Sequence, residues 1–537
     1  MRQSTRLIVN TLVTYFRMAL TVGLGLAVTR IALGQLGAED FGTLATLGAS
    51  GILLLFLSDA LTASTQRHLA FEIGRDDHAA LATVFNTALV IFGALGLVAG
   101  AVGMALWPVL RSIIEVPPGR GDAAFWVYVL TLASLVVTVL ATPYRGYLTA
   151  KQSFVCIALY DLGQAVFGLI AVLILTTMGG DKLVHYAWLL LGVRVAAESV
   201  AVAVSLVAFR DCWPRPWLFR MKEVPRIASF AGWSLFVLIA WRLRVQGSAI
   251  LLNSFYGPGP SAAYGLATQV GGYQNQVGAA VWRAVSPAMT SIEAKGGDRA
   301  VQSLALVSSK YLTLLTLFFL IPVEYEMEQL LGLWLKGPLP PFTVSLTRLV
   351  LVWTALNWVS VGYQMAMEAK GNLGRYAIFL SAFDAGVLVV QIAALAFIPL
   401  GADSRPVVDP WLMQVIAIVI LAAQNVGRAW YVGKVLHIPL SRWAREVLLP
   451  CAVVGVIAGG IALVPFLWMA ASPWRLLATT AAFGLTATPA IWFLAMAAWE
   501  REHFVRVARG GVRLGLKLMG RKPPEPASAT LDQGISG

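Results

Sequence analysis

The stretch IVNTLVTYFRMALTVGLGLAVTR, residues 8–30, places an arginine in the middle of an otherwise apolar run. The run is long enough for a transmembrane helix, which needs about 20 predominantly apolar residues. Asn10, Thr14, Arg17 and Thr21 recur at helical spacing, so they form one polar face. Arginine at the centre of a spanning helix costs roughly 2.5–3.5 kcal/mol on insertion scales, and this cost indicates a water-filled or ligand-filled interior.

Thirteen further apolar stretches follow, and nearly all of them carry a polar or basic residue near the middle. The chain of 537 residues is 58% hydrophobic and only 12% charged, with a mean hydropathy of +0.74. Soluble domains are about one quarter charged, so the composition predicts an all-α polytopic membrane protein. We expect about fourteen transmembrane helices, near residues 8–30, 42–65, 80–108, 123–147, 154–178, 183–208, 229–255, 262–288, 301–323, 342–367, 376–399, 411–435, 448–469 and 476–498.

Lysine and arginine gather in alternate loops and in the C-terminal tail. The basic set includes Arg75, the run 210–226, Lys295 and Lys370. Positive charge marks cytoplasmic loops, so we expect both termini in the cytoplasm. The net charge of +13 then reflects topology and contact with anionic membrane lipids, and we expect no nucleic-acid partner.

The two halves of the chain share landmarks at an offset near 221 residues. RIALGQLGAEDFG (30–42) resembles AILLNSFYGPGPSAAYG (249–265), and Asp161 in the fifth stretch matches Asp384 in the eleventh. Six spans per half is an even number, so both halves enter the membrane in the same orientation. This predicts parallel repeats around an axis along the membrane normal, with the substrate path between them.

The predicted organisation has six parts. An N-terminal six-helix half and a C-terminal six-helix half are joined by a cytoplasmic linker, and two additional transmembrane helices follow. A basic amphipathic helix and a disordered tail complete the chain, because the last stretch is rich in Pro, Ser and Gly. In order, these parts are 1–209, 210–228, 229–436, 437–498, 499–522 and 523–537.

Basic residues inside the spans are the candidate substrate-binding groups. We expect them to line a cationic cavity together with Gln276: Arg17, Arg145, Arg194, Arg242 and Arg283. Arg244 lies about 200° around the helix from Arg242, so both cannot face one lumen, and Arg242 is preferred because its face is more polar. Two alternatives remain. The polar stripes are also typical of helix packing faces, and Arg194 is four residues from Glu198, which allows a pair within one helix.

The acidic residues inside spans are candidates for ion coupling. Asp59, Asp161 and Asp384 are placed in this class, although Asp161 and Asp384 also suit a role in neutralising basic neighbours. Lys310, Arg348 and Arg428 are expected to reach an interface or to meet a carboxylate. The three cysteines lie far apart and the five histidines form no cluster, so no metal or cofactor site is predicted. Short outer loops leave no room for a soluble catalytic domain, and we do not expect an enzyme.

The opening pattern TYFRMAL…TRIALGQLGAEDFG, together with the predicted span count and the six-plus-six repeat, resembles the polysaccharide-transporter (oligosaccharide flippase) family. This family belongs to the multidrug/oligosaccharidyl-lipid/polysaccharide exporter superfamily, whose fold is called MATE-like. The resemblance implies that an undecaprenyl-diphosphate-linked oligosaccharide moves from the inner to the outer leaflet of a bacterial inner membrane. Such export serves O-antigen, exopolysaccharide or capsule synthesis, with the polysaccharide polymerase as an expected partner.

Other functions in the same fold or membrane remain open. Lipid II flippases share the fold and the two added helices, and they also use basic cavity residues. A multidrug or cation exporter would be expected to have acidic cavity residues, whereas the first span has Arg17. A membrane glycosyltransferase or polymerase would need larger outer loops. Arginine is the preferred multidentate partner of phosphate, so the mid-span arginines favour a diphosphate passenger.

Overall fold

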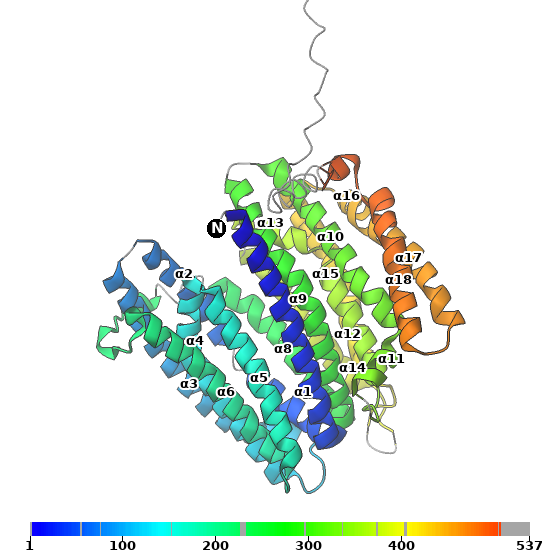
Figure 1. Ribbon diagram of the computed structural model, residues 1–537. Helices are drawn as coiled ribbons and strands as arrows, with labels where there is room; N and C mark the ends of the chain where they lie inside the picture. Colours follow the sequence, from blue (N-terminus) through cyan, green and yellow to red (C-terminus); the bar gives the residue numbers. More distant parts are fainter. Residues whose placement is uncertain are drawn as a thin grey trace, which may run out of the picture.

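The computed structural model describes most of the chain, and the described residues are almost wholly helical (Figure 1). These residues contain no strand, and their β-structure is limited to one isolated bridge between Leu400 and Pro406. The all-α class predicted from the composition is therefore confirmed. The described ranges are 3–53, 56–75, 77–151, 153–225, 232–294, 297–335, 337–371, 374–401, 405–502 and 504–505.

The N-terminal half consists of the six helices expected from the apolar stretches, but the first two spans are joined. One long element contains the first span and residues 42–53 of the second, because its helical segments continue across a kink at Gly37, where φ is 76°. The rest of the second predicted span lies in α2. Glycine suits this turn, since a residue with a Cβ adopts positive φ only at a cost. The helices are α1 (Gln3–Leu53), α2 (Phe56–Gly74), α3 (His78–Ile113), α4 (Gly121–Ala150), α5 (Phe154–Thr177) and α6 (Lys182–Ala208).

The C-terminal half begins with a similar turn. Gly257 lies between its first two helices with φ of 85°, in the segment that the sequence matches to the region of Gly37. The repeat as a whole stays a prediction. The helices of this half are α8 (Gly232–Tyr256), α9 (Pro258–Ala294), α10 (Asp298–Tyr325), α11 (Met327–Leu335), α12 (Thr343–Asn357), α13 (Val361–Lys370), α14 (Gly374–Phe397) and α15 (Trp411–Leu436).

A pair of C-terminal helices lies against the outside of this half. α17 (Leu449–Trp468) and α18 (Pro473–Ala490) pack on each other and on α10 (Figure 1). Leu314 of α10, Cys451 of α17 and Phe483 of α18 belong to the buried cluster between them. Short segments complete the pair, namely α16 (Leu440–Trp443), η3 (Ala444–Leu448) and η4 (Ile491–Ala495).

Ten described helices are long and apolar enough to cross a membrane, and a bent pair raises the number to eleven. The pair is α12 and α13, which meet at 43° across a short break. The predicted count of fourteen is not reached by this criterion. One reason is the joined element α1, and another is the polar composition of α9, whose length includes Gln269, Gln274 and Gln276.

The lipid-facing surface of the bundle is strongly apolar. Leu97 of α3 is 69% exposed, and Leu485 of α18 is 78% exposed. Contiguous exposed apolar surface is unfavourable in water, whereas hydrocarbon is as apolar as leucine itself. The chain is therefore a multi-pass membrane protein, with its buried polar groups turned inward.

The two halves are joined at the end of the molecule opposite the N-terminus. Here α1 packs along α8 and α9, and Thr46 hydrogen-bonds Ser261 at 2.6 Å. At the adjoining loops, Arg405 pairs with Glu115 at 3.0 Å, and the amide of Glu115 donates to Asn253. Toward the end that carries the N-terminus, the ribbons of the two halves diverge (Figure 1). The two halves are therefore in contact at one end of the bundle.

The two halves approach closely between the backbones of α1 and α9. A Cβ on Gly42 of α1 would overlap the carbonyl oxygen of Pro258, the first residue of α9. Further along the same helices, Thr29 donates to Gln269 at 2.8 Å, and Trp334 donates to the carbonyl of Leu26 at 2.7 Å. Small residues allow this contact, as they do where membrane helices cross closely.

Candidate functional site

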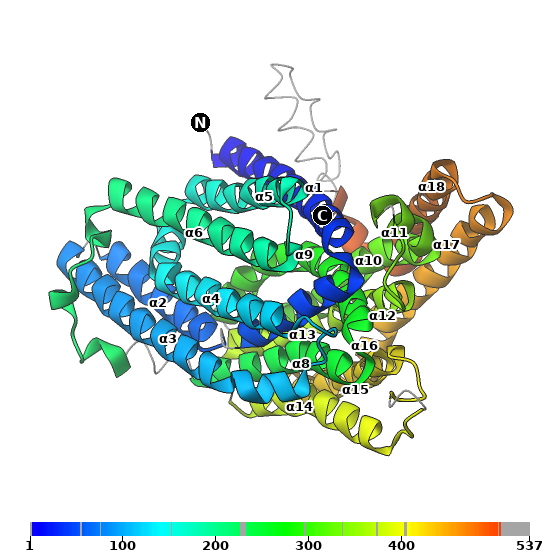
Figure 2. The same ribbon diagram turned by 90° about the horizontal axis from the view of Figure 1, so that it is seen from below.

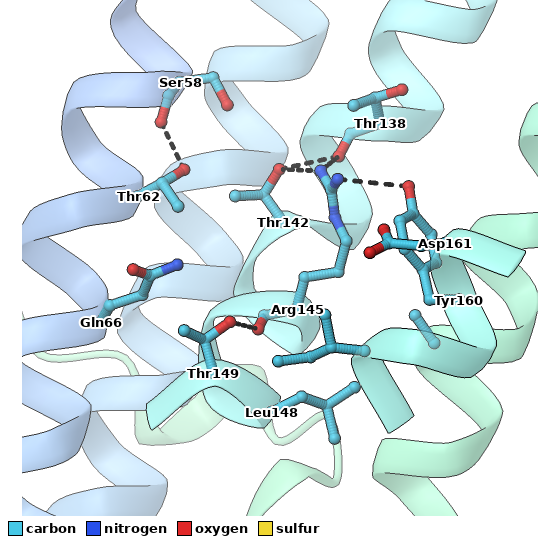
Figure 3. A pocket seen from close by; sticks show the side chains of 12 residues that line it. Ser58, Thr62, Gln66, Thr138, Thr142, Arg145, Leu148, Thr149, Tyr160 and Asp161 are labelled. Atoms are coloured by element: carbon cyan, nitrogen blue, oxygen red, sulfur yellow. Dashed lines mark hydrogen bonds between the residues drawn. The ribbon is translucent and has the colours of Figure 1, made fainter. Parts of the chain in front are cut away.

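A polar pocket lies inside the N-terminal half, between α2, α4, α5 and α6 (Figure 3). Its volume is about 350 Å³, which is at the lower end of the range for small-ligand pockets. Hydroxyl, amide and charged side chains form most of its lining. The lining residues are Ser58, Thr62, Gln66, Thr138, Thr142, Arg145, Leu148, Thr149, Ile157, Tyr160, Asp161 and Ala201.

One face of α4 supplies the polar wall of this pocket. Thr138, Thr142, Arg145 and Thr149 are spaced by three and four residues, so their side chains lie above one another on the helix. The hydroxyl of Thr142 donates to the carbonyl of Thr138 at 2.8 Å, and that of Thr149 donates to the carbonyl of Arg145 at 2.9 Å. Each threonine thereby satisfies its donor on its own helix and keeps acceptor capacity toward the pocket.

Arg145 is held by contacts from three helices. Its Nη2 donates to the hydroxyl of Thr142 at 3.1 Å, and its Nη1 donates to the hydroxyl of Tyr160 on α5 at 3.3 Å. Its Nε lies 3.3 Å from a carboxylate oxygen of Glu198 on α6. The guanidinium is therefore fixed in direction, as Figure 3 shows, while about one third of the side chain (32%) stays exposed.

Glu198 is the acidic centre of the cluster behind the pocket. Its side chain is only 3% exposed, and it accepts a hydrogen bond from Tyr160 at 2.9 Å. Arg194 approaches it at 3.9 Å within the same helix, so one buried carboxylate faces two arginines. Arg145, Arg194 and Glu198 carry a formal net charge of +1, and Asp161, which lines the same pocket, adds a second carboxylate to the cluster.

The predicted site residues fall into separate groups. Arg145 and Asp161 line the pocket, and Arg194 adjoins it through Glu198. Arg194 and Glu198 do form the pair within one helix that the sequence left open, although the contact with Arg145 is shorter. The expectation that the arginines of both halves line one cavity stays a prediction.

The candidates from the C-terminal half lie outside this pocket. Gln276 and Arg283 are exposed on α9, and Arg242 is half-buried on α8 with its guanidinium 5.3 Å from the ring centre of Trp241. None of the three is among the residues that line the pocket around Arg145.

Asp384 has a structural partner. It accepts from Nε of Arg244 at 2.8 Å, and the same guanidinium stacks over Trp353 at 4.1 Å from the ring centre. Arg244 is 6% exposed, so it is part of the interior of the C-terminal half. The suggestion that Asp384 neutralises a basic neighbour is confirmed by this geometry. An Arg244→Ala change would leave the carboxylate of Asp384 without this partner, so we expect it to destabilise the C-terminal half.

Two predicted site side chains lie outside the described part of the chain. These are Arg17 and Asp59, whose helices α1 and α2 are described as backbone only at those positions. Most of the predicted amphipathic helix 499–522 and the whole tail 523–537 also lie outside it.

Sequence reasoning overlooked several lining residues. Ser58, Thr62 and Gln66 recur every four residues along α2, a polar stripe that the sequence contained. Tyr160 gave no such signal, since a single tyrosine at the start of an apolar span is typical of a membrane interface. Among the described residues, no group of three or more His, Cys, Asp or Glu side chains is placed to hold a metal ion.

Comparison with known proteins identifies the family. A sequence model described as polysaccharide biosynthesis protein matches residues 10–293, more than half of the chain. The chain belongs to this family. No curated protein sequence matches it detectably.

Solved structures show the same fold at low sequence identity. An inward-facing multidrug-resistance MATE transporter of the MOP superfamily superposes with a TM-score of 0.65 at 14% identity, covering 79% of this chain and 95% of its own. Lipid II flippase MurJ in an inward closed conformation superposes with a TM-score of 0.65 at 10% identity, covering 90% of this chain and 98% of its own. A MOP superfamily transporter from Pyrococcus furiosus superposes with a TM-score of 0.54 at 13% identity, covering 80% of this chain and 96% of its own. The family member described here therefore has the MOP-superfamily fold.

Proposed function

We propose that the chain is a flippase that moves an undecaprenyl-diphosphate-linked oligosaccharide from the inner to the outer leaflet of a bacterial inner membrane. The observation that carries this proposal is Arg145, whose guanidinium is fixed by Glu198 and Tyr160 and remains one third exposed on a hydroxyl-lined pocket. Membership of the polysaccharide biosynthesis family supports the same substrate class. The proposed role is transport, not catalysis.

The chemistry of the pocket suits the polar part of such a passenger. Arginine presents a planar set of donors that matches phosphate oxygens, and desolvation in a membrane protein strengthens that pairing. Thr138, Thr142, Thr149 and Tyr160 offer hydroxyl groups, which pair with sugar hydroxyls. A volume of about 350 Å³ accommodates a headgroup or part of the glycan, while the polyprenyl tail stays in lipid.

Alternating access is part of this proposal, and the contact between the halves supports it. The end opposite the N-terminus is closed by the pairs Thr46–Ser261 and Glu115–Arg405, so release there requires the halves to separate. The fold agrees better with an inward-facing MATE transporter, at a TM-score of 0.65, than with an outward-facing one, at 0.57. In this proposal Arg17, Arg242, Arg283 and Gln276 contribute to the path in other states.

Ion coupling belongs to the same proposal and rests on fewer observations. Asp161 lines the pocket with Arg145, so protonation or cation binding there would alter the charge that the passenger meets. Asp59 is proposed on sequence grounds alone. Asp384 is a weaker candidate because its carboxylate already forms an ion pair with Arg244.

Removing the Arg145 guanidinium tests the binding role directly. We expect Arg145→Ala to lower export per inserted molecule about tenfold to a hundredfold, since a charged hydrogen-bonded contact contributes about 1.5–3 kcal/mol. Export is measured as surface polysaccharide in a strain lacking the chromosomal gene, divided by the amount of protein in the membrane. Arg145→Lys should restore part of the loss, because lysine retains the charge but not the planar geometry.

A double variant separates binding from packing. Arg145→Ala leaves Glu198 buried with one distant partner, so a folding defect is a competing explanation. Arg145→Ala combined with Glu198→Gln removes both charges and keeps the hydrogen bond to Tyr160. If Arg145 engages the passenger, the double variant remains inactive although its protein level is normal. Recovery of export by the double variant would contradict the proposal. Arg442→Gln, at an exposed surface pair, is the control.

The orientation in the membrane has its own test. Reporter fusions after residues 75, 222, 295 and 520 should all report the cytoplasm, because the basic loops alternate along the chain. Two periplasmic signals among the four would overturn the predicted topology. A fusion after residue 119, in the loop between α3 and α4, serves as the periplasmic control.

Lipid II is the second candidate passenger. The observation in its favour is that the superposition with MurJ covers 90% of this chain, whereas the inward-facing MATE transporter covers 79%. Loss of a lipid II flippase would stop peptidoglycan synthesis and lyse the cells. Loss of a polysaccharide flippase would leave cells viable, with a lipid-linked oligosaccharide accumulating in the inner leaflet. Depletion of the protein followed by analysis of both lipid pools distinguishes the two.

A further inference from the structure

The linker between the halves is an ordered segment with an unusual composition. Residues 209–222 read FRDCWPRPWLFRMK and contain two short helical turns, η1 (Arg210–Cys212) and η2 (Pro216–Leu218). The segment runs along the outer edge of the N-terminal half, next to the start of α3 (Figure 2). It therefore belongs structurally to that half.

The backbone of the linker is fixed to α3. Asn86, which is fully buried, donates to the carbonyl of Trp213 and accepts from the amide of Arg215. One residue further along α3, the hydroxyl of Thr87 accepts from the amide of Arg220 at 3.2 Å. These bonds hold the linker backbone at a defined level along α3.

The acidic group of the linker is turned toward the protein. Asp211 lies 3.1 Å from Nδ1 of His78 and accepts from the hydroxyl of Tyr147 at 3.2 Å. The next residue, Cys212, is fully buried in a cluster with Tyr147 and Phe85. The negative charge of the segment is thus directed inward.

The outward face combines large apolar side chains with basic ones. Trp217 is 77% exposed and Met221 is 70% exposed, and Trp213 is also largely exposed. The exposed basic side chains alternate with them along the same short segment, namely Arg210, Arg220 and Lys222. Fixed, exposed tryptophan is unfavourable in water and typical of the membrane interface.

The level of the linker relative to the membrane follows from helix geometry. α3 has 36 residues and is about 54 Å long, which exceeds the roughly 30 Å of hydrocarbon by about 24 Å. If this excess is shared by both ends, the hydrocarbon begins about 12 Å from His78, the first residue of α3. Asn86 and Thr87 lie eight and nine residues along the helix, at about that height.

We propose that residues 209–222 form an interfacial anchor that binds anionic phospholipid headgroups in the leaflet on this side of the membrane. Trp213 and Trp217 lie at the boundary of hydrocarbon and headgroups, where the indole ring is favoured. Arg210, Arg220 and Lys222 meet the lipid phosphates, whose charge is opposite to theirs. A soluble protein partner is disfavoured, because the segment is level with the lipid and not above it. The anchor is independent of the substrate that the protein transports.

A fluorescent label at position 217 tests the depth of the segment. The labelled protein carries Trp217→Cys for attachment and Cys156→Ser to remove a partly exposed thiol. The two remaining cysteines react slowly with the label, because burial raises the pKa of the Cys212 thiol and Cys451 is also buried. In vesicles of phosphatidylethanolamine and phosphatidylglycerol, a bimane at 217 should be quenched by brominated lipid and protected from iodide. Arg75→Cys, in the exposed turn between α2 and α3, is the aqueous control. Iodide quenching at 217 equal to that at 75 would overturn the proposal.

The charge requirement is tested in vesicles that differ only in anionic lipid. Arg220→Gln with Lys222→Gln removes two of the exposed charges, which should lower retention of phosphatidylglycerol in native mass spectra by roughly 30-fold. The iodide protection of the label should then no longer depend on the phosphatidylglycerol content. Arg111→Gln, at the opposite end of α3, should change neither result. Protection that is indifferent to anionic lipid when Arg220 and Lys222 are retained would refute recognition of headgroups.

Discussion

Replacing Gly42 with valine is expected to lower export strongly while the protein still folds and inserts. Even a Cβ at this position overlaps the backbone of Pro258, so α1 and α9 cannot approach as they do at the closed end. Overpacking costs about 1–3 kcal/mol, which shifts the balance against the closed state about 5-fold to 150-fold. A transporter that cannot close one side of the membrane cannot complete its cycle.

Spin labels measure this shift directly. Arg75 and Arg375 are exposed, one in each half, toward the end that carries the N-terminus. Spin labels attached to cysteines at both positions report the distance between the halves at this end. Gly42→Val should move the distance distribution to shorter values as the halves separate at the opposite end. Gly48→Val is the matched control, because a Cβ at Gly48 meets no atom within 4 Å. Unchanged distances together with normal export would show that the contact is not a gate.

Breaking the buried pair between Lys310 and Glu500 is expected to destabilise the protein by about 3–5 kcal/mol. Lys310 Nζ lies 2.6 Å and 2.8 Å from the two oxygens of Glu500, and it donates to the carbonyl of Ala495 at 2.9 Å. The two side chains are 7% and 5% exposed, so Lys310→Met leaves a carboxylate without its countercharge. The melting temperature in detergent should fall by several degrees.

The double variant Lys310→Met with Glu500→Gln should recover most of this loss, because no buried charge is then left alone. Arg442→Gln is the surface control. Its partner Glu446 is 47% exposed, and exposed pairs contribute at most about 1 kcal/mol. If the double variant melts no higher than Lys310→Met, the two groups are not coupled and the interpretation is wrong.

The sequence predicted the helical class and the positions of most spans, because apolar length and composition are local properties. It did not predict that α1 continues through the Gly37 turn or that α12 and α13 are separated by a bend of 43°. Both features depend on φ and ψ at a few residues. Apolar periodicity contains little information about such local turns.

For the site, the sequence predicted groups on one helix better than groups that meet from different helices. The face of α4 with Thr142 and Arg145 follows from spacing alone. The contact of Arg145 with Glu198 depends on how α4 and α6 are rotated about their axes, and packing sets that rotation. The same limit applies to Lys310, which was expected either to reach an interface or to meet an unidentified carboxylate, and to Arg244 with Asp384.

Because α1 and α9 cross near one end of the molecule, a small rotation at the crossing produces a larger displacement at the other end. From Gly37 to the first described residue, Gln3, α1 extends about 51 Å at 1.5 Å per residue. A rotation of about 10° at the crossing would therefore move the far end of the helix by about 9 Å. A small rotation at the crossing thus corresponds to a displacement several times larger at the far end of the helix. The absence of a side chain at Gly42 determines how closely α1 and α9 approach at the crossing.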